Sequence, residues 1–115
     1  MFYILDGKKI KHADRNEFYA WYPEANKRIA LTTIKDCNIS TVFLGIDHQF
    51  SLRGNLPILF ETMVFGGKYD GYRQQYSTYE EAEEGHEEII MLINDLSPNI
   101  FVDIFYKTIG NLFSK

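Results

Sequence analysis

The stretch that decides the fold is Ile39–Phe50, ISTVFLGIDHQF, followed after a short loop by Pro57–Gly67, PILFETMVFGG. Both segments are rich in β-branched and aromatic residues, which predicts strands at Ile39–Ile46 and Ile58–Phe65. Side chains alternate between the two faces of a strand. One face of the second strand therefore carries Leu59, Glu61, Met63 and Phe65, and the other carries Ile58, Phe60, Thr62 and Val64. Glu61 is a carboxylate within an apolar row.

Two further strands flank this pair. Arg28–Lys35 precedes it, with Asp36, Cys37 and Asn38 as a turn, and Tyr72–Tyr76 follows a glycine-rich turn. A helix is expected over Thr78–Leu96, because Ser77–Glu80 and Thr78–Glu81 each match the S/T-x-x-E capping box. The pattern predicts an α+β domain in which helices cover one main face of a four-stranded antiparallel sheet.

The first part of the chain is predicted to form a small hairpin and a short helix beside this sheet. Asp6-Gly7 suits the tight turn of a small hairpin. A short helix is expected over residues 17–22, where Phe18, Trp21 and Tyr22 share one face, and Pro23 should end or kink it. That aromatic stripe is interpreted as core rather than as a ligand site.

A chain of 115 residues fits one domain, predicted as residues 1–96. Ser97-Pro98 opens a second predicted helix, a C-terminal appendage over residues 97–115. Its apolar positions cover more than half its circumference: Ile100, Phe101, Ile104, Phe105, Ile109, Leu112 and Phe113. We expect it to pack on the domain or on a second subunit, which makes it a candidate surface for homo-oligomer formation. It is too short to span a bilayer.

Composition and charge argue against some classes of function. The 45% hydrophobic and 24% charged fractions are typical of a soluble globular domain. The net charge is −4, and residues 41–115 hold eleven acidic against five basic residues, which disfavours direct nucleic-acid binding. Cys37 is the only cysteine, so neither a disulfide nor a cysteine-based zinc site is expected. The N-terminal residues predict no signal peptide, and no membrane association is expected.

Four polar residues are candidates for chemistry: Asp47, His48, Glu61 and His86. A carboxylate beside an imidazole could act as an acid–base pair or hold a divalent metal, with Asp47 and His48 as the candidate ligands. Each also has a structural interpretation, because His86 lies on the apolar side of its helix and Asp47-His48 could satisfy a turn. Glu61 could pair with Arg28, Arg53 or Arg73. Phosphate-binding and nucleophile-elbow motifs are absent from the sequence.

The sequence also carries a resemblance. Ser40–Phe50 and Pro57–Gly67, with Asp70, Arg73, Tyr76, Thr78, Glu81-Ala82 and Gly85-His86, resemble a group of small uncharacterised bacteriophage and prophage proteins. Trp21 and Arg28-Ile29-Ala30 extend the similarity, which spans roughly residues 16–93. The resemblance implies a phage or prophage origin and action in the bacterial cytoplasm, and it carries no assigned reaction. Pro23 and the segment from Ser97 depart from the pattern.

The positions matched in this way supply the binding candidates, which are Glu61, Thr62, Asp70, Arg73 and Trp21. The leading hypothesis is a non-enzymatic accessory protein that binds a host or viral protein, for example to interfere with host defence. A small nucleotide is an alternative ligand for its aromatic loops. The second hypothesis is a metal-assisted hydrolase that uses Asp47, His48 and Glu61. The third is a structural or assembly protein.

Overall fold

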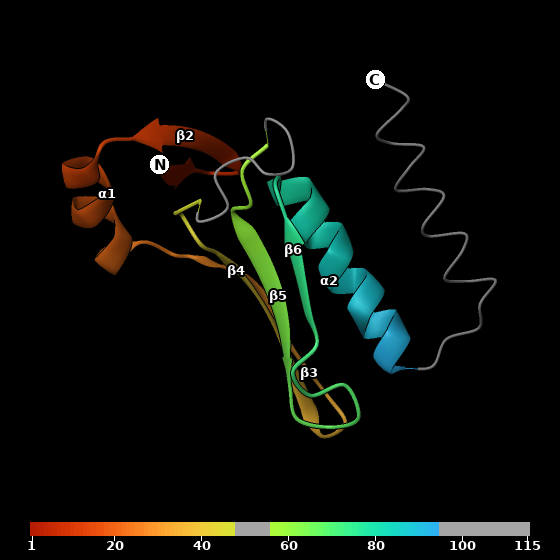
Figure 1. Cartoon of the computed structure of the whole chain (residues 1–115). Coiled ribbons are helices and arrows are strands. Elements are labelled where there is room, and N and C mark those ends of the chain that lie inside the picture. Colours follow the sequence, from red (N-terminus) through yellow and green to blue (C-terminus); the bar gives the residue numbers. More distant parts are fainter. Residues whose placement is uncertain (48–55, 95–115) are drawn as a thin grey trace.

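The computed structural model of the chain describes residues 1–47 and 56–94 (Figure 1). The predictions about His48, Arg53 and the helix at 97–115 lie outside these residues. No helix in the part described is long and apolar enough to cross a membrane.

The main sheet contains four strands, β3 (Arg28–Ile34), β4 (Cys37–Phe43), β5 (Phe60–Phe65) and β6 (Arg73–Tyr76). Neighbours in sequence are neighbours in the sheet, and every pair is antiparallel. This confirms the predicted α+β fold and strand order.

The strand predicted at residues 39–46 instead runs from Cys37 to Phe43. It cannot run on through Gly45, whose φ of 79° is left-handed. There the Gly45 carbonyl accepts a hydrogen bond from the Tyr3 amide, and a Cβ would lie 2.6 Å from Cε1 of the Phe18 ring. Close approach of the N-terminal segment therefore ends the strand.

Helix α2 (Tyr79–Ile93) packs on one face of the sheet (Figure 1). Of the two candidate capping boxes, the second is formed: the Thr78 hydroxyl accepts from the Glu81 amide, and the Glu81 carboxylate accepts from the Thr78 amide. The helix is shorter than the predicted 78–96, with Asn94 as its C-cap. Its buried stripe is Ala82, Gly85, His86, Ile89 and Ile93.

The N-terminal part forms a separate two-stranded sheet, β1 (Phe2–Asp6) and β2 (Lys9–Ala13), followed by α1 (Arg15–Trp21). Pro23 ends α1 as expected, in a short 3₁₀ turn η1 (Tyr22–Glu24). The hairpin lies on the same side of the main sheet as α2, since Lys8 near its tip pairs with Glu83 at 3.2 Å.

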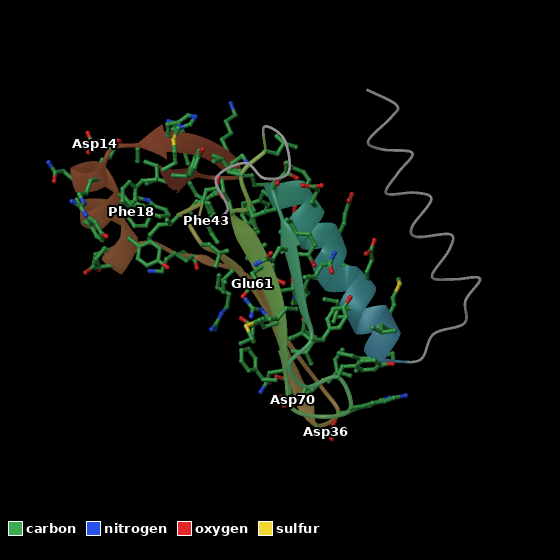
Figure 2. The ribbon with its side chains drawn as sticks, viewed as in Figure 1. Asp14, Phe18, Asp36, Phe43, Glu61 and Asp70 are labelled. Carbon is green, nitrogen blue, oxygen red and sulfur yellow. The ribbon has the colours of Figure 1, made fainter. Side chains whose placement is uncertain are left out.

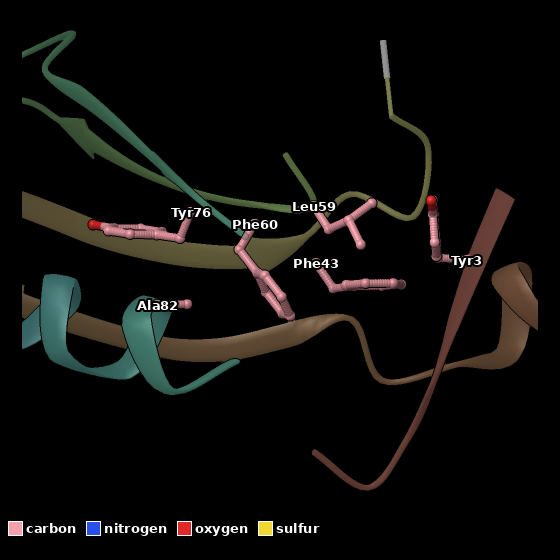
Figure 3. Close-up of a cluster of buried hydrophobic side chains, with 6 residues drawn as sticks. All are labelled: Tyr3, Phe43, Leu59, Phe60, Tyr76 and Ala82. Carbon is pink, nitrogen blue, oxygen red and sulfur yellow. The ribbon is translucent and has the colours of Figure 1, made fainter. Parts of the chain in front are cut away.

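Two apolar clusters fill the space between the sheet and its cover. The first contains Tyr3, Phe43, Leu59, Phe60, Tyr76 and Ala82 (Figure 3). The second contains Cys37, Ile39, Val64, Ile89 and Ile93. The rings of Phe43 and Phe60 pack in a tilted arrangement with 5.2 Å between their centroids, so an aromatic contact joins neighbouring strands inside the core.

The opposite side of the main sheet, here called the open face, has no helix or second sheet over it in residues 1–47 and 56–94 (Figure 1). Its side chains follow from the strand register and alternate with those that contact α2. They are Arg28, Leu31, Thr33, Asn38, Ser40, Val42, Glu61, Met63, Phe65, Arg73 and Gln75. Leu31 and Phe65 are 51% and 50% exposed.

Candidate functional site

Glu61 lies on the open face near the start of β5, between Val42 of β4 and Gln75 of β6 (Figure 2). Its Oε2 accepts hydrogen bonds from Arg73 Nη2 and Gln75 Nε2, each at 3.0 Å, both on the adjacent strand β6. The Glu61 side chain is 11% exposed, whereas that of Arg73 is 57% exposed. Of the three arginines considered from the sequence, Arg73 is the partner, and it compensates the buried carboxylate.

His86 is held between the sheet and α2 with 2% of its surface exposed. Its Nε2 lies 2.9 Å from the Thr32 hydroxyl and its Nδ1 lies 2.7 Å from the Thr41 hydroxyl. Thr41 also hydrogen-bonds Thr62 on the neighbouring strand. Both ring nitrogens therefore have partners, and the imidazole is a hydrogen-bonded core residue that substrate could not reach.

The expected pairing of Glu61 with an imidazole is not made by His86. Thr62, the next residue after Glu61, belongs to the hydroxyl network around His86. Successive residues of a strand point to opposite faces, so Glu61 and His86 are separated by the sheet itself. Within residues 1–47 and 56–94, no three His, Cys, Asp or Glu side chains come close enough to hold a metal ion.

Asp47 lies at a third place, in the wall of a cavity of about 590 Å³ beside the N-terminal hairpin. Tyr3 and His12 are among its polar lining residues, and Ile10 and Leu59 are among its apolar ones. Burial, and secondarily the charge of Asp47, raises the pKa of Tyr3. Among residues 1–47 and 56–94, no Lys or Arg lines this cavity, whereas the Asp47 carboxylate does.

The remaining binding candidates are dispersed. Thr62 is fully buried on the α2 side. Asp70 lies in the β5–β6 turn, where its carboxylate accepts a hydrogen bond from the Gly66 amide at 2.6 Å (Figure 2). Trp21 packs edge-on against Phe43 at 5.9 Å. Only Glu61 and Arg73 of the five are brought together.

Sequence reasoning missed Thr32 and Thr41, the two residues that bind His86, and it missed the exposed Leu31 and Phe65. A signal for the threonines exists, because Thr32, Thr41 and Thr62 are small polar residues that alternate with the residues of the open face. Register was needed to show that all three face the same histidine.

Acidification should destabilise the protein through His86. Burial lowers the pKa of this imidazole in the folded state, with the charge of Glu87 opposing the effect. The unfolded chain then binds the proton more readily, so stability falls as pH drops below about 6.5, the ordinary histidine value. Urea unfolding across this range should show that the stability lost on replacing His86 by leucine becomes smaller at lower pH.

The ionisation of Glu88 changes the stability in the opposite direction, so its contribution must be separated from that of His86. Burial, and secondarily Glu84, raises the pKa of Glu88, so this carboxyl adds stability as pH falls towards its ordinary value. Glu88 is present in both proteins, and its contribution cancels when their stabilities are subtracted. A stability difference that stays constant with pH would contradict the assignment to His86.

Comparison of the chain with protein-family models, with curated proteins and with solved structures gives no match. The arguments about function therefore rest on the geometry above.

Proposed function

We propose that this protein is a phage- or prophage-type accessory protein that acts by binding a partner protein through its open face. The observation that carries the proposal is the pair of half-exposed apolar side chains, Leu31 and Phe65, beside the Glu61–Arg73 ion pair. Exposed apolar side chains next to polar groups on one surface are typical of a protein interaction site.

The chemistry of the face limits the partner. Leu31, Met63 and Phe65 offer an apolar surface across β3 and β5, which are two strand spacings, or roughly 10 Å, apart. Arg73 uses one nitrogen on Glu61 and remains 57% exposed, so its other guanidinium N–H groups can bind a carboxylate of the partner. The partner proposed is a host or viral protein with apolar side chains next to an acidic residue.

The alternative of a metal-assisted hydrolase has less support. Its mechanism needs the Glu61 carboxylate to be available, and Arg73 and Gln75 both donate to it. Neither Glu61 nor Arg73 is among the residues that line the Asp47 cavity.

A photo-crosslinking side chain at position 65 tests the proposal in cells of the bacterial host. The control places the same side chain at Tyr19, an exposed aromatic residue on α1. One defined protein should be captured from position 65 and not from position 19. The purified protein should then bind directly, and Leu31→Asp or Arg73→Glu should weaken binding by about 10- to 100-fold.

Glu87→Lys, an exposed change of charge on α2, is the matched variant that should leave this affinity nearly unchanged. Adducts only with a second copy of the chain would make the open face a self-association surface instead. The proposal would be overturned if positions 65 and 19 captured the same protein equally well. It would also be overturned if Arg73→Glu left the affinity of direct binding unchanged.

A further inference from the structure

A cleft of about 290 Å³ lies beside the start of β3, an edge strand of the main sheet, and it is separate from the Asp47 cavity. Its walls come from the hairpin tip (Leu5, Gly7), the chain after α1 (Trp21, Asn26), the start of β3 (Arg28) and the start of α2 (Tyr79). Segments far apart in sequence therefore meet at this cleft.

Two aromatic rings that line the cleft are held in place by contacts with core residues. Trp21 packs edge-on against Phe43, with 5.9 Å between centroids and 86° between planes. Tyr79 packs in the same way against Phe60, at 5.9 Å and 81°. Rings held in this manner lose little conformational entropy when a flat ligand stacks on them, which favours recognition of a heteroaromatic base.

The charge of the cleft is positive. Arg28 is exposed and makes no ion pair with any residue in 1–47 or 56–94. Of the residues that the structure describes, no Asp or Glu lines the cleft. Lys8 lies over the Tyr79 ring, 5.4 Å from its centroid, and also pairs with Glu83. An arginine beside two aromatic rings matches a ligand that joins a planar base to a phosphate.

We propose that this cleft binds a mononucleotide. The base lies against Trp21 and Tyr79, and the phosphate pairs with Arg28. Asn26 Oδ1 accepts a hydrogen bond from the Arg28 amide at 3.3 Å, and the Asn26 NH₂ group supplies a donor for the sugar or the base edge. The volume is at the small end of ligand sites, which suits one nucleotide and excludes a dinucleotide. This inference is independent of partner binding on the open face.

The experiment titrates the full-length protein with AMP, GMP, adenosine and inorganic phosphate. Trp21 is the only tryptophan of the chain, so its fluorescence reports directly on the cleft. AMP or GMP should change the emission, adenosine should bind at least about tenfold more weakly than AMP, and phosphate alone should not change the emission.

Variants then separate the two halves of the site, with calorimetry as the readout. Arg28→Gln should weaken nucleotide binding by about tenfold or more and leave adenosine binding unchanged. Trp21→Leu should weaken both by roughly 5- to 100-fold, as the loss of one stacking ring predicts. Arg15→Gln, an exposed change of the same kind on α1, is the matched control and should have no effect.

Several outcomes would overturn the proposal. These are the absence of binding by both AMP and GMP, equal affinity of the wild type and Arg28→Gln, and equal affinity for AMP and adenosine. Because Trp21 contacts the core, Trp21→Leu could fail to fold. The Arg28 comparison decides the proposal in that event, since Arg28 is exposed.

Discussion

Replacing His86 by leucine is expected to lower the free energy of unfolding by about 3 kcal/mol, as measured by urea unfolding at neutral pH. Leucine fills much of the space, but it cannot hydrogen-bond Thr32 or Thr41. The Thr41 hydroxyl is fully buried and would keep only Thr62 as a partner, so the lost hydrogen bond is not replaced by water.

A double-mutant cycle distinguishes lost hydrogen bonding from lost packing. Thr41→Val removes the hydroxyl that contacts Nδ1 of His86. If the bond matters, the double variant should lose less stability than the sum of the two single variants, by about 1–3 kcal/mol. His12→Leu is the matched control at an exposed histidine and should cost little. Strict additivity in the cycle would contradict a role for the Thr41–His86 bond.

Gly85→Val is expected to cost about 3 kcal/mol, because it forces a side chain into a space that Tyr76 already fills. A Cβ at position 85 would collide with the hydroxyl and ring carbons of Tyr76. Tyr76 is a buried core residue next to Ala82 of α2, so its ring must shift to admit the added side chain (Figure 3). Chemical unfolding of both proteins measures the loss.

The controls for Gly85 exploit helix propensity. Glycine is normally the weaker helix former, so valine on an exposed turn of α2 would cost little or help. Glu87→Val places the same β-branched residue at an exposed position of α2 and should change stability by less than about 1 kcal/mol. Tyr76→Leu in the Gly85→Val background should restore part of the loss. Failure of this rescue would show that the ring is not the obstacle.

Tyr76 has a second distinctive property. Its hydroxyl is buried without a well-aligned hydrogen-bond partner among the described residues, and burial raises the pKa of Tyr76 to about 12 although Thr62 favours ionisation. The phenol therefore stays neutral at physiological pH, and the Tyr76 side chain contributes to the core by packing against α2.

The sequence by itself determined the features that depend on near neighbours. Alternation in residues 60–65 assigned Phe60, Thr62 and Val64 to one face and Glu61 to the other, and the structure has them so. The two overlapping capping boxes placed the start of α2 to within one residue, and Pro23 predicted the end of α1. These signals succeed because a strand repeats every two residues and a cap closes within one helical turn.

Only the tertiary structure decided how the polar residues are grouped. Arg73 rather than Arg28 pairs with Glu61, and His86 meets Thr41 across the sheet–helix interface. Both outcomes depend on strand register and on which face α2 covers, and a shift of one residue would reverse them. The same packing left the open face without a layer in the described residues and brought Trp21, Arg28 and Tyr79 to one cleft. Contacts between segments dozens of residues apart have no local signal, since they exist only once the chain has folded.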